Sequence, residues 1–546
     1  MNIVKLLLRA SWSTIVIAVF MSGLSGGCAV ALIALIATAL RQSQPPSLLV
    51  LGGFISLCCI QLITRFISEV LLTRLGQGMT CHLQTLLGQR ILASSLRQIE
   101  IIGAPALLSS LTEDIEYISN FVTFIPLVCI NIAVVSGCLV YLSWLSGMLF
   151  LVLLVFLELG IVSLLFLQTK AIAELKLARQ QQDRLFQHLS AMTEGIKELK
   201  LHSARRQAFL SEDLQLTSVA AKNHKIAGMT IYTGAASWGE ALHFLIVGIL
   251  LFFLPSLQPI SRSVLSAYVL AFIYMGTYIG QILNVLPNFG KATVALHKIS
   301  DLGLLLESSA ESRTFTLCES GSSWQPLELL GVTHIYRKEQ DDSSFTLGPL
   351  NLTITAGKLV FITGGNGSGK SSLVKLLTGL YIPEAGEIWL NGYLIDDTNR
   401  EWYRQHFSAV FSDFYLFERF LGLHKIDERV QEYLVKLQLE HKVKVENGRL
   451  STTNLSQGQR KRLALLTAYL EDRPIYLFDE WASDQDPIFK KTFYEELLPE
   501  LKSKGKTVLV VSHDEQYFGA ADQIVRLDYG QVLEKTPLLS LSEFSQ

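Results

Sequence analysis

The feature that most constrains the fold is a set of long stretches without any charged side chain. They lie within the first 290 residues, at 10–40, 42–64, 117–157, 241–261 and 263–290. A helix of about 20 apolar residues crosses the hydrocarbon core of a bilayer, and the third stretch is twice that length. A turn-like break within it, at 143–147, predicts two spans joined by a tight hairpin. The sequence therefore predicts six membrane-spanning helices.

Basic side chains predict the orientation of these helices. Nearly all Lys and Arg residues of this half lie near the N-terminus and in the segments 65–116, 170–237 and 291–300, whereas the opposite side has only Arg41 and Arg262. Segments rich in Lys and Arg remain in the cytoplasm. We therefore expect both termini there. The alternative for the first span is a cleaved signal peptide, but its apolar stretch is too long and cleavage would leave five spans.

The overall composition narrows the class of protein. Half of the 546 residues are apolar and the formal net charge is −2. No basic excess is available to neutralise phosphates, which argues against a nucleic-acid partner. The seven cysteines show no metal-like spacing.

The second half of the chain has a different pattern. Short β-rich runs alternate there with helical runs, which predicts a mostly parallel α/β domain. A Ser-, Glu- and Gly-rich stretch precedes it and is typical of a linker. The expected organisation is an α-helical transmembrane domain over 1–305, a linker over 306–326 and an α/β P-loop nucleotide-binding domain over 327–546.

The strongest chemical signal is the glycine-rich run 364–371. It follows the apolar run 359–362 and precedes a helical run, which is the strand–loop–helix context that a P-loop requires. Backbone N–H groups converge on phosphate there, Lys370 would reach the β- and γ-phosphates, and Ser371 would bind Mg²⁺. The residues predicted to contact ATP are Gly364, Asn366, Gly367, Ser368, Gly369, Lys370, Ser371 and Ser372.

A second signal is the apolar run 475–478, which ends in Asp479 and Glu480. Phosphoryl transfer depends on positioning and charge neutralisation. Asp479 is predicted to hold Mg²⁺, directly or through water, and Glu480 to polarise the attacking water.

A third signal stands 20 residues before Asp479. The run Leu455-Ser456-Gln457-Gly458-Gln459 precedes a helical segment, so Ser456 would lie at a helix N-terminus that favours anions. This run resembles the signature motif of ATP-binding cassettes. The resemblance implies that Ser456, Gly458 and Gln459 cap the γ-phosphate held by the opposite subunit, and hence a homodimer with two ATP molecules between its cassettes.

The same resemblance extends to three further positions. His513 matches the switch histidine that contacts the γ-phosphate, and Asp486 matches the loop after the catalytic glutamate. Tyr336, 28 residues before the P-loop, matches the aromatic residue that stacks on adenine.

Two departures from the family stand out. Gln457 replaces a usual glycine, and Ser412 stands where a glutamine usually helps to bind Mg²⁺. A hydroxyl is too short for that role, and water or Asp413 are the two possible substitutes.

Six spans followed by one cassette resemble the exporter class of ABC transporters. The runs 412–413, 455–459 and 479–487 resemble its cyclic-peptide subfamily, whose members export siderophores and lipopeptides from bacteria. The resemblance implies ATP-driven export of a cyclic peptide or related secondary metabolite across the bacterial cytoplasmic (inner) membrane. The alternatives are a lipid or lipid-linked-glycan flippase and a membrane-bound ATPase sensor that regulates a partner.

Three ionisable residues in the membrane half are candidates for the substrate cavity. Glu158 lies deep in the fourth predicted span, while Glu240 and His243 begin the fifth. A carboxylate in a membrane usually faces a cavity or a partner. The alternative for Glu158 is a structural acid that is hydrogen-bonded to a neighbouring helix. By resemblance, the segments 103–111 and 202–209 are expected to dock onto the cassettes.

Overall fold

The computed structural model describes residues 3–41, 48–257, 261–308, 326–337, 344–423 and 427–537. The chain forms two compact units. One comprises Met1–Leu87 with Leu108–Leu302, and the other comprises Gly88–Leu107 with Gly303–Gln546. Most of the predicted linker, 309–325, lies outside the described residues.

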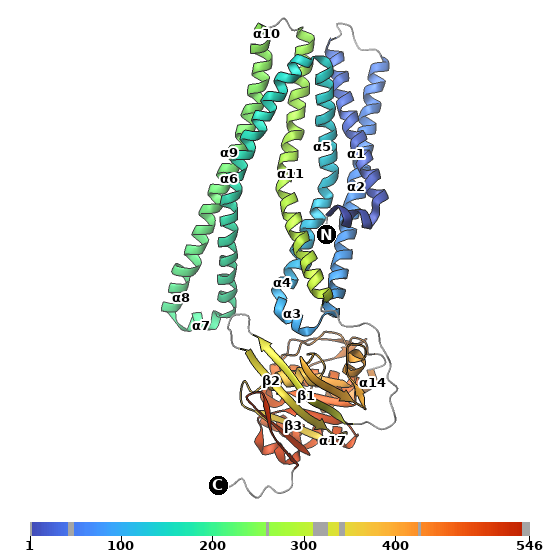
Figure 1. The fold of residues 1–546 in the computed structure, drawn as a ribbon, viewed down its shortest axis with the longest axis vertical. Helices are drawn as coiled ribbons and strands as arrows, with labels where there is room; N and C mark the ends of the chain where they lie inside the picture. Colours follow the sequence, from blue (N-terminus) through green and yellow to red (C-terminus); the bar gives the residue numbers. More distant parts are fainter. Residues whose placement is uncertain are drawn as a thin grey trace. The chain divides into compact units, whose positions relative to one another are not determined.

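Six of the described helices are long and apolar enough to cross a membrane, which confirms the predicted number of spans. In Figure 1 they run from α1 in blue to α11 in yellow-green. Their bounds are α1 (Ile3–Arg41), α2 (Leu48–Ala93), α5 (Ile115–Leu145), α6 (Gly147–Glu194), α9 (Leu216–Gly248) and α11 (Arg262–Ser308).

Short helices and π-helical turns connect or extend the long ones. They are α3 (Leu96–Ile102), α4 (Ala104–Ser109), η1 (Ser110–Asp114), α7 (Ile196–Leu201), α8 (Ser203–Ala208), η2 (Phe209–Gln215), η3 (Ile249–Phe253) and α10 (Leu254–Leu257).

The predicted break in the long apolar stretch is confirmed at Ser146. This residue has extended dihedrals (φ −164°, ψ 112°) and separates α5 from α6. The buried hydroxyl of Tyr268, on α11, lies 2.6 Å from the Ser146 carbonyl oxygen and 2.5 Å from that of Leu142. Both carbonyl oxygens also accept a backbone N–H, from Ser146 and from Phe150. The Tyr268 hydroxyl therefore adds a contact from α11 at the point where α5 ends and α6 begins.

The second unit contains two main sheets. The six-stranded sheet has the order β12-β11-β3-β10-β9-β6, and its strands are parallel except for β12. The other sheet is antiparallel, with the order β2-β1-β4-β5. The bounds are β1 (Leu327–Arg337), β2 (Ser344–Ile354), β3 (Leu359–Gly364), β4 (Ala385–Leu390), β5 (Tyr393–Leu394), β6 (Phe407–Val410), β9 (Ile475–Asp479), β10 (Thr507–Val511), β11 (Gln523–Asp528) and β12 (Gln531–Pro537).

Alternation along β3 builds a core on each face of the parallel sheet. Leu359 and Phe361 pack into one apolar cluster, and Val360 and Ile362 pack into the other. Since successive side chains of a strand point to opposite faces, one buried strand serves both cores. The predicted parallel α/β domain is therefore confirmed.

Helices surround these sheets, and a small hairpin, β7 (Val445–Glu446) with β8 (Arg449–Leu450), lies between β6 and β9 in sequence. The helical elements are α12 (Lys370–Leu377), α13 (Arg400–Arg404), α14 (Asp427–Lys436), α15 (Gln457–Glu471), η4 (Trp481–Asp484), α16 (Pro487–Thr492), η5 (Phe493–Leu497), α17 (Leu498–Ser503) and η6 (Glu515–Ala520).

Helix α3 belongs to the second unit and makes polar contacts within it. The carboxylate of Glu100 accepts hydrogen bonds from Lys375 at 2.7 Å and from Tyr381 at 2.6 Å, and Arg97 pairs with Glu384. These contacts lie just before the predicted docking segment 103–111, whose residues up to Leu107 belong to the same unit. Gly103 (φ 80°) ends α3. Docking by 103–111 stays a prediction. The second predicted segment, 202–209, stays a prediction.

Candidate functional site: a nucleotide site at the ends of four parallel strands

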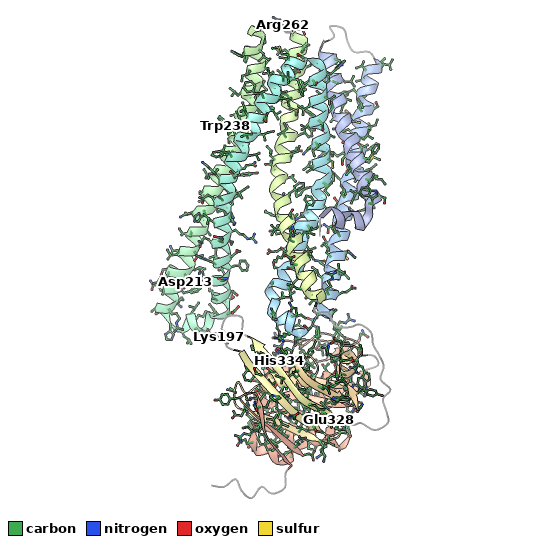
Figure 2. The ribbon with its side chains drawn as sticks, in the orientation of Figure 1. Lys197, Asp213, Trp238, Arg262, Glu328 and His334 are labelled. Carbon is green, nitrogen blue, oxygen red and sulfur yellow. The ribbon has the colours of Figure 1, made fainter. Side chains whose placement is uncertain are left out.

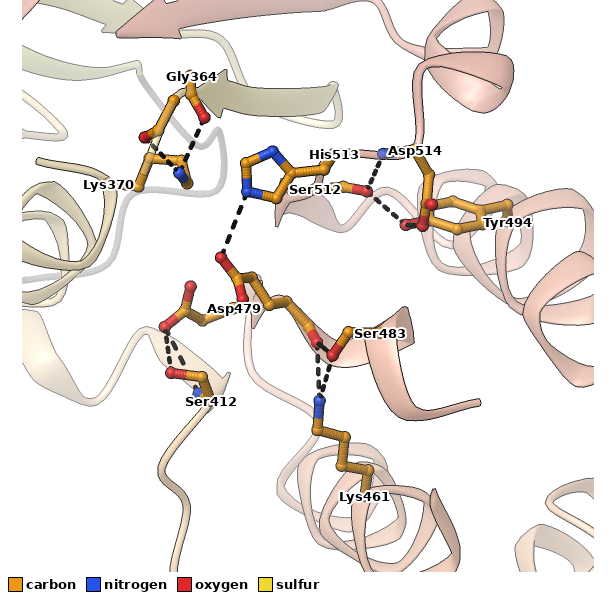
Figure 3. A network of polar contacts seen from close by, with 12 residues as sticks. Gly364, Lys370, Ser412, Lys461, Asp479, Ser483, Tyr494, Ser512, His513 and Asp514 are labelled. Atoms are coloured by element: carbon orange, nitrogen blue, oxygen red, sulfur yellow. Dashed lines mark hydrogen bonds and ion pairs between the residues drawn. The ribbon is translucent and has the colours of Figure 1, made fainter. Parts of the chain in front are cut away.

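Four neighbouring parallel strands end beside one another. In the order β3-β10-β9-β6, they lead into the P-loop, His513, Asp479 with Glu480, and Ser412. Because the carboxyl ends of parallel strands meet at one edge, residues as far apart in sequence as Gly364 and His513 lie in one site (Figure 3). Open α/β sheets bind their ligands at this edge.

The P-loop folds back on its own lysine. The Lys370 ammonium donates hydrogen bonds to the carbonyl oxygens of Gly364 and Gly365, both at 2.9 Å. Gly364 has φ 151°, and a Cβ there would lie 2.3 Å from the Leu527 carbonyl oxygen. Only glycine allows this turn. The loop therefore places a buried cation at the first turn of α12.

The remaining P-loop residues fit a phosphate-binding role. The Ser368 hydroxyl is buried and has no hydrogen-bond partner among the described residues. A buried polar atom without a partner is costly, and a phosphate oxygen would supply one. Asn366, Gly367 and Ser371 are exposed, while Gly369 and Ser372 are partly buried.

Asp479, at the end of β9, is held by Ser412. The Ser412 hydroxyl donates to Asp479 Oδ2 at 3.1 Å, and its backbone N–H lies 3.5 Å from the same oxygen. Burial raises the pKa of Asp479, and the hydrogen bonds from Ser412 oppose that rise. The serine that replaces the usual glutamine thus orients the predicted metal-binding carboxylate.

Glu480 points its carboxylate at His513. Glu480 Oε1 lies 3.6 Å from His513 Nε2, and Glu480 has left-handed dihedrals (φ 49°, ψ 34°). This conformation is unfavourable for a residue with a Cβ, so the surroundings must maintain it.

Lys461, which sequence reasoning missed, provides that support. Its ammonium is buried and lies 2.8 Å from the Glu480 carbonyl oxygen, 2.9 Å from the Ser483 hydroxyl and 2.7 Å from the Asp484 carboxylate. In return, the Trp481 indole N–H donates to the Lys461 carbonyl at 2.8 Å. Lys461 belongs to α15, so the helix after the signature run holds the catalytic loop (Figure 3).

The residues on both sides of His513 form side-chain hydrogen bonds with Tyr494. The Tyr494 hydroxyl lies 2.7 Å from the Ser512 hydroxyl and donates to Asp514 at 3.0 Å, and Lys490 pairs with Asp514 at 2.6 Å. Sequence reasoning missed this anchor because Tyr494 lies on η5, 19 residues before His513.

The signature run forms an N-cap on α15. The Ser456 hydroxyl accepts from the Gln459 backbone N–H and the Gln459 side chain accepts from the Ser456 N–H, which is a capping box. A Cβ at Gly458 would lie 2.6 Å from the Asp484 carbonyl oxygen. Gln457 is exposed, so a side chain fits there but not at the next position.

Asp486 and Tyr336 lie in separate parts of the cassette. Asp486 caps α16 by accepting from the Phe489 N–H at 2.9 Å, and it pairs with Arg462 on α15. Tyr336 is exposed on β1, opposite Phe345 of β2, whose ring lies 3.3 Å from the position of a Cβ at Gly369. Opposed residues of antiparallel strands share a face, so Tyr336 lies on the P-loop side. Stacking on adenine stays a prediction.

The first unit contains a pocket of about 450 Å³ between α6, α9 and α11. Glu240 and His243 line it together, as the sequence suggests. Glu158 is exposed on α6 and is not one of the described residues that line the pocket. The structure therefore brings together two of the three cavity candidates.

The fold and the site define an ATP-driven membrane transporter. Residues 11–282 match the family model described as ABC transporter transmembrane region, and residues 347–483 match the family model described as ABC transporter. Together with the relatives below, these matches show that the chain belongs to the ABC transporter family. The predictions of ATP binding and of an exporter-type half-transporter are confirmed.

Three relatives illustrate this membership. The chain is 37% identical to the ATP-binding protein SyrD of Pseudomonas syringae pv. syringae over 88% of its own length and 87% of that protein. It is 32% identical to the probable syringafactin export ATP-binding/permease protein SyfD of P. syringae pv. syringae (strain B728a). This match covers 38% of the chain and 33% of that protein. An ATP-dependent lipid A-core flippase of Alkalilimnicola ehrlichii is 24% identical to the chain, over 86% of the chain and 81% of the flippase.

Proposed function

We propose that two copies of this chain export a cyclic peptide or related secondary metabolite across the bacterial cytoplasmic membrane. The observation that carries the proposal is that one chain combines the nucleotide site with a mostly apolar pocket among its membrane helices. The relative named for syringafactin export and the near full-length match to SyrD favour this class of substrate. By the positive-inside rule, both termini lie in the cytoplasm.

In the proposed hydrolytic site, the P-loop N–H groups and Lys370 hold the phosphates. Ser371 and Asp479 would hold Mg²⁺, with Asp479 oriented by Ser412. Bound Mg²⁺ would neutralise charge on the phosphate oxygens. Glu480 polarises the attacking water, and His513 orients the Glu480 carboxylate.

The second copy completes each site through the loop that contains Ser456, Gly458 and Gln459. Ser456 is exposed at the N-terminus of α15, a position that suits an anion. ATP must favour the closed dimer by about 5.5 kcal/mol to reverse a 1:99 population. Closure then turns the membrane cavity outward, and hydrolysis resets it.

The test is ATPase stimulation and transport by the full-length chain in proteoliposomes, with a cyclic lipopeptide as probe. We expect the lipopeptide to raise ATP turnover and to accumulate in the lumen of inside-out vesicles. Turnover without accumulation of any probe would contradict export and favour the ATPase sensor.

A lipid flippase is the second candidate, since the lipid A-core flippase matches 86% of the chain. Stimulation by a labelled lipid A-type glycolipid, with none by the lipopeptide, would favour it over the peptide exporter.

A further inference from the structure

The pocket between α6, α9 and α11 has the dimensions of a ligand site. Its volume of about 450 Å³ falls within the range of about 300–1,000 Å³ that small-molecule sites occupy. Aromatic and aliphatic side chains form most of its walls, among them Phe156, Leu164, Phe272 and Ile273. This volume accommodates one large side chain of a peptide together with part of its ring.

Glu240 gives the pocket a negative charge. It is the only Asp, Glu, Lys or Arg among the described residues that line the pocket. No hydrogen bond or ion pair joins it to any other residue in the described part of the chain. It directly precedes the charge-free stretch 241–261, where a carboxylate is costly unless it faces water or a cation.

His243 lies one helical turn further along α9, on the same face as Glu240. Its ring stacks on Phe272 of α11, with centroids 4.6 Å apart and planes 11° apart. A Cβ at Gly276 would lie 2.2 Å from His243 Cε1, so the missing side chain at Gly276 makes room for the ring. A flat imidazole is therefore fixed in the wall beside the carboxylate.

Two hydrogen bonds tie α9 to its neighbours around this pocket. Tyr232 donates to Asn284 of α11 at 3.0 Å, and Trp238 (labelled in Figure 2) donates to Ser163 of α6 at 3.2 Å. Because α9 is tied on both sides, Glu240 and His243 lie on a defined wall.

We infer that this pocket is the subsite for a positively charged side chain of the exported peptide, an amine or a guanidinium. Glu240 pairs with the cation, the His243 ring lies beside it, and the apolar walls bury its aliphatic stem. This inference rests on the proposed export of peptides. It adds that the exported peptide carries a positively charged side chain.

The test uses two cyclic lipopeptides that differ only in one lysine, free in the first and Nε-acetylated in the second. ATPase stimulation is measured on the full-length chain in nanodiscs. For the wild type, we expect half-maximal stimulation at an about tenfold lower concentration of the free amine, because acetylation removes the charge that pairs with Glu240. Glu240→Gln should reduce this ratio to within about twofold, and Glu240→Asp should retain part of it.

Two further variants sharpen the test. Gly276→Ala displaces the His243 ring and should also reduce the preference for the amine. Glu158→Gln removes a carboxylate that does not line the pocket and should retain the full preference.

The possible outcomes distinguish a failure of the proposed subsite from a failure of the proposed function. Equal stimulation by both peptides in the wild type, unchanged in Glu240→Gln, would overturn the subsite and leave peptide export standing. Absence of stimulation and transport with either peptide would instead contradict the proposed function.

Discussion

The ammonium of Lys461 lies 2.8 Å from the carbonyl oxygen of Glu480. Lys461 is only 2% exposed, and it also forms an ion pair with Asp484, which lies just after Glu480 in the chain. The helix that begins at the signature run is thus joined directly to the residue predicted to polarise water. A displacement of the signature run would therefore be transmitted to Glu480 through Lys461.

Lys461→Met should lower kcat for ATP with little change in KM. Loss of the ammonium frees the left-handed backbone at Glu480, and a misplacement of about 1 Å costs about 10²-fold in rate. Steady-state ATPase of the full-length chain measures both constants. Asp484→Asn is the matched control, since Lys461 retains its two other oxygen partners, and its effect should be much smaller. Unchanged kcat in Lys461→Met would contradict the role of the contact.

Gly458→Ala should destabilise the cassette, because its Cβ would lie 2.6 Å from the Asp484 carbonyl oxygen. Overpacking of this kind costs about 1–3 kcal/mol. The melting temperature of the cassette transition and the ATPase rate should both fall. Gln457→Ala, at the exposed neighbouring position, should change neither. Equal behaviour of the two variants would contradict the close approach.

Ser412→Ala should raise the Mg²⁺ concentration needed for half-maximal ATPase activity. The hydroxyl orients Asp479 at 3.1 Å, and removal of such a supporting hydrogen bond typically costs about 10–100-fold in metal affinity. Ser412→Gln restores the residue usual in the family and should retain the wild-type Mg²⁺ dependence. A titration of Ser412→Ala that matches the wild type would argue against this role.

The motifs of the proposed nucleotide site can be found in the sequence because each motif is local. A P-loop, an acidic strand end and a helix N-cap each form within about ten residues, and parallel strands bring them to one edge. Ser412 was singled out in the sequence, but its hydrogen bond to Asp479 and the contacts of Lys461 could not be predicted. Their partners lie 67 and 19 residues away in sequence, and the contacts depend on how β6 and α15 pack.

Stability of the cassette should decrease below about pH 6.5 through His334. Burial lowers the pKa of His334, although the Glu384 carboxylate, 2.9 Å from Nδ1, opposes this effect. The folded state therefore keeps His334 neutral where the unfolded chain takes up a proton, so unfolding is favoured as pH falls.

Thermal unfolding of the wild type and of His334→Gln at pH 7.5 and 5.5 measures this contribution. The wild-type melting temperature should fall more over this range than that of the variant. His406 is partly buried and also has a lowered pKa, but it is unchanged in both proteins. The difference between the two proteins therefore isolates His334. An equal pH dependence of the two proteins would contradict the prediction.

The most direct test of the hydrolytic site is the ATP turnover of Glu480→Gln. The substitution keeps the shape of the side chain that faces His513 and removes the carboxylate that we propose polarises water. Turnover should fall by about 10²–10⁴-fold, the usual contribution of a general base, while ATP still binds. A variant that hydrolyses ATP at close to the wild-type rate would contradict the account.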